Sequence, residues 1–252
     1  MGAVRQTARD AVVLEVMAHQ YGLPLDLLAP VLGVSASRAS GVVSRWRRAG
    51  WVRSGRVDSG STWVWPVRSR ARELLGWEVS EWAPRPAVCG HVRAVAATRL
   101  HRVGLNSERW ESERFWQHQV GWRHRRGERV PHLPDGVEIL PDGRRLLVEV
   151  ELTAKSRSRY LDGSPGRVSS DRVSGLLSDV ASRARELECA GVVYWCAPKV
   201  LKVVQEVVGE YAERVRESRA RVPLPEGAWP DPRWAVRDIS EVPRWRVEPP
   251  QR

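Results

Sequence analysis

Acidic and basic side chains that could do chemistry on a phosphate ester gather in one short stretch of the sequence: Asp135, Glu149, Glu151 and Lys155. The stretch predicts a β-hairpin whose strands flank the turn 141–143, the second strand covering 144–152. With a loop of those three residues, Asp135 lies directly opposite Glu149. Strand alternation then puts Glu149 and Glu151 on the same face, so three carboxylates are expected on one side of a sheet.

Like charges that face each other destabilise a sheet, so something must neutralise these carboxylates. The candidates are Lys155, an arginine, or a divalent cation such as Mg²⁺ (or Mn²⁺), which prefers carboxylate oxygens. A metal held by Asp135 and Glu149 could orient a water molecule and stabilise the charge that develops on a phosphate under attack. The alternative is a structural hairpin whose acidic face is solvated or paired with arginine. Tyr160 is a further candidate, as a covalent nucleophile, although an aromatic residue there more often packs or contacts phosphate.

The elements that must position these residues predict an α/β domain over 91–222. After an expected helix over 91–103, the segment 109–129 is too mixed to assign. Beyond the hairpin, the apolar spacing predicts a helix, a buried strand and a second helix, in that order: 171–188, 191–196 and 200–215. This order is typical of a nuclease-like α/β core. The tail 223–252, rich in Pro and Trp, is expected to wrap the surface or to add a short strand.

A second group of residues lies near the N-terminus, in a predicted helix-turn-helix. Helices are expected over 8–20 and 25–32, followed by a tight turn and by Ser35 as the N-cap of a third helix. In that third helix, apolar residues at helical spacing form a buried stripe: Ala39, Val42, Val43 and Trp46. Two strands, 51–53 and 62–65, follow as a hairpin, so residues 1–76 are expected to be a winged helix-turn-helix.

The face opposite the buried stripe is small and rich in arginine, which suits a helix that enters the major groove of DNA. Together with the hairpin it supplies the expected DNA contacts: Ser37, Arg38, Arg45, Arg48, Arg53 and Arg56. Arg47 belongs to the same basic cluster. The chain carries 41 Lys and Arg against 30 Asp and Glu, a net charge of +11, which attracts polyanions such as double-stranded DNA. A winged helix that serves only to dock a protein is the alternative.

Other features limit the function classes. The segment 77–90, with Pro84 and Pro86, is expected to link the two domains. Three scattered cysteines suit a reducing cytoplasm, and no apolar run long enough to span a membrane occurs. The absence of a Gly-x-x-x-x-Gly-Lys phosphate loop argues against ATP-driven unwinding. His132 stands alone, without the His-hydrophobic-His motif of rolling-circle relaxases.

The acidic pattern resembles that of restriction-endonuclease-like PD-(D/E)XK domains, with Pro134 before Asp135 and the Glu149-x-Glu151 pair. The resemblance implies that Asp135 and Glu149 hold the metal. Where the family has a water-activating Lys, this chain has Glu151, so Lys155 would supply the cation instead. Glu113 would correspond to the extra acidic residue and metal ligand of some members.

Over most of the chain, the order of motifs is similar to that of the replication-relaxation family of actinobacterial and firmicute plasmids and mobile elements. The motifs are a winged helix, a helix from His91, Trp-x-x-Glu-Arg at 110–114, Pro-Asp-Gly at 134–136 and Glu-Val-Glu-Leu-Thr-x-Lys at 149–155. The resemblance implies DNA binding in plasmid or mobile-element replication or mobilisation. Two alternatives stay open: a Mg²⁺-dependent DNA endonuclease or nickase, and a winged-helix transcriptional repressor. The partner beyond DNA is a second copy of the chain or a replication or mobilisation protein.

Overall fold

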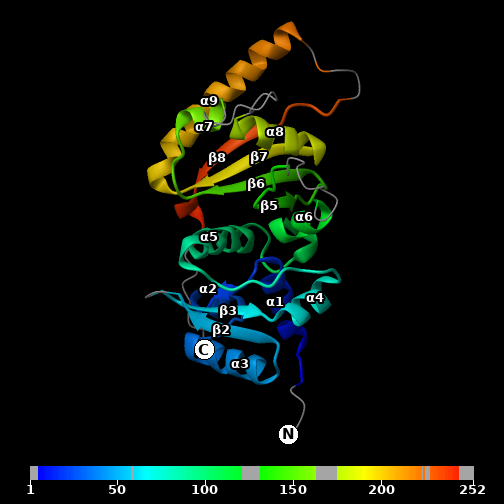
Figure 1. The fold of residues 1–252 in the computed structure, drawn as a ribbon, viewed down its shortest axis with the longest axis vertical. Helices are drawn as coiled ribbons and strands as arrows, with labels where there is room; N and C mark the ends of the chain where they lie inside the picture. Colours follow the sequence, from blue (N-terminus) through cyan, green and yellow to red (C-terminus); the bar gives the residue numbers. More distant parts are fainter. Residues whose placement is uncertain are drawn as a thin grey trace. The chain divides into compact units, whose positions relative to one another are not determined.

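A computed structural model of the chain describes residues 5–57, 60–120, 131–162, 175–222, 224 and 228–243 and has a mixed α/β fold (Figure 1). Its contacts divide the chain into two compact units. The first comprises residues 1–122 with 242–252, and the second comprises 123–241. The division therefore falls after Trp122, whereas the sequence suggested a linker at 77–90.

The first unit begins with three helices, a short strand and a hairpin: α1 (Ala8–His19), β1 (Leu23–Pro24), α2 (Leu25–Val31), α3 (Ala36–Arg48), β2 (Val52–Arg56) and β3 (Thr62–Pro66). It continues with elements that the sequence did not predict, or predicted at other bounds: α4 (Arg68–Leu75), α5 (Pro86–Val103), a 3-10 turn (Ser107–Arg109), β4 (Trp110–Ser112) and α6 (Glu113–Val120). The helix expected from His91 thus starts five residues earlier, at Pro86, whose fixed φ suits a first helical position.

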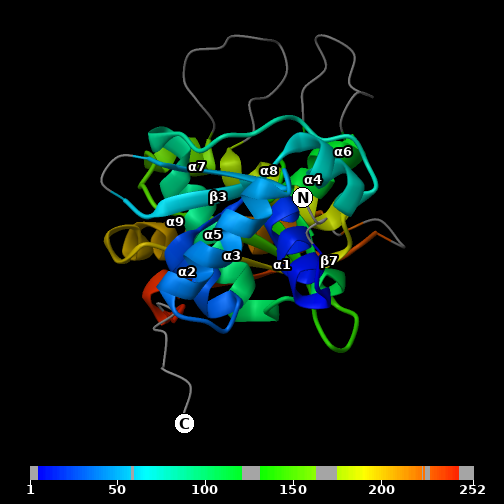
Figure 2. The same ribbon diagram turned by 90° about the horizontal axis from the view of Figure 1, so that it is seen from below.

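Local sequence explains where the first helices begin. Thr7 caps α1 in a capping box, in which its side chain accepts from the Asp10 backbone N–H and the Asp10 carboxylate accepts from the Thr7 N–H. Ser35 caps α3 as predicted, and Gly33, at φ +65°, allows the tight turn between α2 and α3. Figure 2 shows α1, α2 and α3 side by side.

These helices pack around a core on one side of a three-stranded antiparallel sheet with the order β1-β3-β2. Its fully or nearly fully buried members come from all three helices and from the sheet: Val13, Leu14, Met17, Leu28, Ala39, Trp46, Val52 and Val64. The predicted stripe of α3 is thereby confirmed at Ala39, Val43 and Trp46, while Val42 is half-buried. The tip of the hairpin, residues 58–59, lies outside the described residues.

The predicted linker packs on the first unit instead of separating two domains. Val79 is buried with Ala18, Ala71 and Leu75. The ring of Trp82 contacts Trp63 and Trp65 of β3 and the ring of Tyr21. Aliphatic and aromatic side chains of this segment pack on the core and on the outer face of the sheet. The segment that contains Pro84 and Pro86 is therefore part of the packed first unit and not a free linker.

The described residues of the second unit form four strands and three helices: β5 (Gly136–Ile139), β6 (Arg145–Glu151), α7 (Arg157–Leu161), α8 (Leu176–Glu186), β7 (Cys189–Cys196), α9 (Pro198–Arg221) and β8 (Arg233–Asp238), with a 3-10 turn at Ile239–Glu241. Here the strands run in the order β5-β6-β7-β8. β5 and β6 form an antiparallel hairpin, and β6, β7 and β8 are parallel. Figure 1 shows α7, α8 and α9 on one side of this sheet.

The order hairpin, helix, strand, helix agrees with the sequence-based expectation, and β8 is the extra strand expected in the tail. The predicted helix over 171–188 is described only from Leu176 onward, since residues 163–174 lie outside the described part. Among the described residues, no single helix combines the length and the hydropathy needed to cross a membrane; only α2 and α3 taken together, bent by 96°, meet that measure.

Candidate functional site

The first candidate site is the acidic face of the β5-β6 hairpin. The backbone N–H of Leu140 donates to the Arg144 carbonyl at 2.8 Å, and Gly136 pairs with Val148. One step further, Asp135 comes beside β6, where its Oδ2 accepts from the Val150 N–H at 2.7 Å. The predicted register is therefore confirmed, and Asp135 and Glu149 lie at neighbouring positions of the two strands.

Each glutamate of this face has a cationic or proton-donating partner within the second unit. Glu149 Oε1 lies 2.7 Å from Nε2 of His132, and the Glu151 carboxylate is paired with the Lys155 ammonium. Both glutamate side chains are largely buried, at 12% and 8% exposed. Lys155 thus supplies a neutralising charge, as the sequence suggested it could. His132 is a site residue that sequence reasoning missed, because it precedes the strand and no periodicity places it.

The negative charge of this face shifts the pKa values of neighbouring groups. Burial lowers the pKa of His132, but the charge and hydrogen bond of Glu149, helped by Asp135 and Asp179, outweigh burial and raise it above its usual value. On β7, burial and then Glu151 raise the pKa of Cys196 to about 12.

Tyr160, on α7, lies beside Glu151 and Lys155 and is fully buried. Burial, and then the charge of Glu151, raise the pKa of its phenol. Its oxygen also accepts from the Lys155 backbone N–H at 3.5 Å. A buried phenol beside a carboxylate holds its proton tightly, so this environment does not suit the covalent nucleophile considered from the sequence.

The side chains expected to hold Mg²⁺ already have other partners. Within the described ranges, no three His, Cys, Asp or Glu side chains are grouped so that they could hold a metal ion. The carboxylates of Glu149 and Glu151 face His132 and Lys155 instead. Glu113 lies in the first turn of α6 in the first unit, where it accepts from the Tyr21 hydroxyl at 3.2 Å and from the Gln117 amide at 2.9 Å. As they stand, these donors do not fit a metal.

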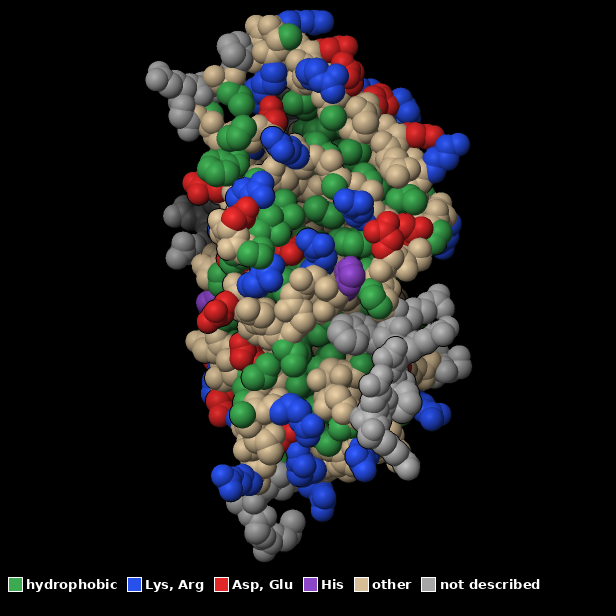
Figure 3. Space-filling model, turned by 180° about the vertical axis from the view of Figure 1, so that it is seen from behind, with side chains coloured by type: hydrophobic (Ala, Val, Ile, Leu, Met, Phe, Trp, Pro, Cys, Tyr) green, Lys and Arg blue, Asp and Glu red, His purple; other side chains and the backbone are tan. Residues whose placement is uncertain are grey.

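The second candidate site is the exposed face of α3. Its exposed residues are small or cationic: Ala36, Ser37, Arg38, Ser40, Gly41, Ser44, Arg47 and Arg48. None of the thirteen residues of α3 is acidic. At the lower end of Figure 3, most of the charged side chains in view are Lys or Arg.

Arg45, predicted on this face, turns toward the interior. Its Nη2 lies 2.9 Å from both carboxylate oxygens of Asp10, which is fully buried, and the Arg45 side chain is 34% exposed. Burial would raise the pKa of Asp10, but the hydrogen bonds from Thr7 and the charge of Arg45 outweigh it and lower that pKa. Arg45 therefore fastens α3 to α1, and the expectation that it contacts DNA does not match its environment. Helical spacing missed this because Arg45 sits at the border between the two faces.

The hairpin β2-β3 adds a groove beside α3. The groove is lined by residues of α3 and of both strands: Ser44, Arg47, Arg48, Val52, Arg53, Ser54 and Trp65. The predicted contact Arg53 lies in it and is paired with Glu81 at 2.8 Å. Arg56 is exposed at the end of β2. The structure therefore brings Arg47, Arg48 and Arg53 together on one surface of the first unit.

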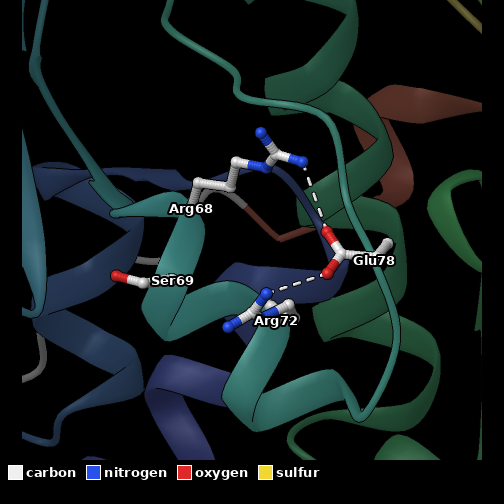
Figure 4. A pocket seen from close by; sticks show the side chains of 4 residues that line it. All are labelled: Arg68, Ser69, Arg72 and Glu78. Atoms are coloured by element: carbon white, nitrogen blue, oxygen red, sulfur yellow. Dashed lines mark hydrogen bonds and ion pairs between the residues drawn. The ribbon is translucent and has the colours of Figure 1, made fainter.

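A separate pocket lies on α4 and is lined by Arg68, Ser69, Arg72 and Glu78 (Figure 4). The Glu78 carboxylate stands between the two arginines and accepts from Arg68 Nη2 at 3.2 Å and from Arg72 Nη1 at 2.9 Å. Arg68 also donates from Nε to the Val79 carbonyl at 2.9 Å. No pattern in the sequence predicts this arginine pair.

Comparisons of the chain with protein-family models, with curated proteins and with solved structures each found no match.

The His132–Glu149 pair makes a prediction about pH. Because the pKa of His132 is raised in the folded state, the pair stabilises the protein below the ordinary histidine pKa of about 6.5, and this stabilisation is lost as the pH rises through the folded-state pKa. An NMR titration of the His132 ring should give a pKa above that ordinary value, and Glu149→Gln should lower it. A His132 pKa that does not move in Glu149→Gln would contradict the pairing.

Proposed function

We propose that the first unit binds double-stranded DNA as a winged helix-turn-helix, with α3 in the major groove and the β2-β3 hairpin as the wing. The observation that carries the proposal is the exposed face of α3, which combines small side chains with arginines and contains no acidic residue. The element order α1-β1-α2-α3-β2-β3 and the arginines beside α3 support it. Guanidinium groups there match both phosphate and guanine edges.

Gly41 gives an independent reason to expect a close partner. Glycine in the interior of a helix costs about 1 kcal/mol relative to alanine. A Cβ at this position would meet no atom within 4 Å beyond the adjacent backbone of α3 itself, so packing against other elements does not require the glycine. A surface that approaches the α3 backbone closely, as the floor of the major groove does, would require it.

The biological setting we propose is replication or mobilisation of a plasmid or mobile element. It rests on the resemblance to the replication-relaxation family that the motifs carry, and the net charge of +11 agrees with work on a polyanion.

Replacing Arg47 and Arg48 by Ala should weaken DNA binding by about 1–3 kcal/mol for each lost base contact, and less where the contact is to phosphate. Fluorescence anisotropy with a labelled duplex at several salt concentrations measures this, because phosphate contacts also set the salt dependence. Arg216→Ala/Arg221→Ala, which removes two exposed arginines of α9, is the matched control. Equal affinities of Arg47→Ala/Arg48→Ala and Arg216→Ala/Arg221→Ala would refute α3 as the recognition helix.

Two substitutions of Gly41 should affect the stability of the protein and its affinity for DNA in different ways. Gly41→Ala should raise the free energy of unfolding by about 0.5–1 kcal/mol, since it removes the helix penalty without a clash. Gly41→Leu should fold as well but bind duplex DNA at least tenfold more weakly, because its side chain would block close approach. Urea unfolding and anisotropy on the same samples test both effects. Wild-type affinity in Gly41→Leu would show that no partner approaches this face.

A second candidate function is metal-dependent cleavage of DNA by the second unit. The observation that favours it is the hairpin register, which brings Asp135 beside Glu149 in the manner of an endonuclease-like site. For Mg²⁺ or Mn²⁺ to bind there, His132 and Lys155 would have to give up Glu149 and Glu151.

Incubation of supercoiled plasmid with the protein tests this candidate, in Mg²⁺, in Mn²⁺ and in EDTA. If the site cleaves, nicked or linear DNA forms only with metal, and Asp135→Ala and Glu149→Ala abolish it. Arg216→Ala, purified in the same way, should cleave as the wild type does and controls for differences between protein preparations. Plasmid that stays supercoiled under all conditions would exclude cleavage and leave the binding function untouched.

A further inference from the structure

Two glutamates of the segment that follows α4 form ion pairs with arginines of the first unit. Glu78 pairs with Arg68 and Arg72 of α4, and Glu81 pairs with Arg53 of β2. Figure 4 shows the Glu78 carboxylate between the two guanidinium groups, with one oxygen toward each. An anion bridged by two guanidinium groups is also the arrangement in which arginines bind a phosphate.

These pairs are weak by their environment. All five side chains are more than half exposed to solvent. Exposed ion pairs add little to stability, because water screens the charges and two long side chains lose freedom. A phosphodiester oxygen could therefore replace either carboxylate at small cost.

The carboxylates are not needed to hold the segment in place. Val79 is buried with Ala71 and Leu75, and Trp82 packs on Trp63 and Trp65. Apolar burial on this scale contributes far more than exposed ion pairs do. The neighbouring apolar residues therefore hold the segment in place, and Glu78 and Glu81 are not needed for this.

Arg53 connects these pairs to the surface of α3. Arg53 lines the same groove as Arg47 and Arg48. At the other end, the Val67 backbone N–H donates to the Trp51 carbonyl at 3.0 Å, which places the start of α4 directly beside the start of β2.

We propose that Arg53, Arg68 and Arg72 form a second contact track for the DNA backbone, and that Glu78 and Glu81 occupy this track as internal substitutes for phosphate when DNA is absent. The proposal rests on the proposed DNA-binding function and adds its regulation: the two carboxylates compete with DNA and lower its affinity. Its ligand is the phosphodiester backbone of duplex DNA, whatever the base sequence.

The test uses the full chain with Glu78→Gln and Glu81→Gln, singly and together, which remove charge but keep shape and a hydrogen-bond acceptor. The double variant should bind duplex DNA roughly tenfold more tightly, since three exposed ion pairs are each worth a few-fold. The logarithm of its affinity should also fall more steeply with the logarithm of salt concentration, by up to about 2.7 for three added phosphate contacts. Glu73→Gln is the matched control, because it makes the same charge change on α4 but pairs with Arg70, outside the track.

Adding Arg68→Gln and Arg72→Gln to the double variant should remove most of the gain, and should cost more there than in the wild type. Circular dichroism and thermal melting confirm that each variant is folded. Single variants Glu78→Gln and Glu81→Gln that each bind no more tightly than Glu73→Gln, while Arg47→Ala/Arg48→Ala still weakens binding, would overturn this inference alone. If neither the wild type nor the double variant binds duplex DNA, both the inference and the proposed function are wrong.

Discussion

One buried carboxylate, that of Asp10, joins α1 to α3. It closes the capping box of α1 and accepts from Arg45 of α3, and it is itself fully buried. A carboxylate removed from water costs several kcal/mol unless a cation and hydrogen bonds compensate it. The pairing of α1 with α3 is therefore tightly specified. The buried stripe of Ala39, Val43 and Trp46 leaves Gly41, Arg47 and Arg48 exposed on the rest of α3.

In the second unit too, carboxylates removed from water need compensating partners. Two glutamates on neighbouring positions of one strand face, with an aspartate beside them, would repel one another in a dry environment. His132 and Lys155 meet Glu149 and Glu151, and a backbone N–H meets Asp135. The chain's own groups thus satisfy the acidic face, so a metal ion could bind there only if those partners were exchanged.

Solvent exposure sorts the arginines of the first unit into two groups. Arg45 is held by a buried carboxylate, and such a pair is costly to break. Arg53, Arg68 and Arg72 are held by exposed carboxylates, and these pairs exchange partners at little cost. The first kind builds the fold, and the second kind is available to a polyanion.

The sequence by itself determined the features that depend on near neighbours. Capping residues and helical spacing placed α1, α2 and α3, and the turn at 141–143 set the register that puts Asp135 beside Glu149. Only the tertiary structure decided which partners distant residues meet: Arg45 with Asp10, His132 with Glu149, and the segment after Gly76 with the first unit. The reason is physical. Periodicity reports which side of an element is apolar, whereas the partner of a charge is chosen by burial and packing between elements far apart in the chain.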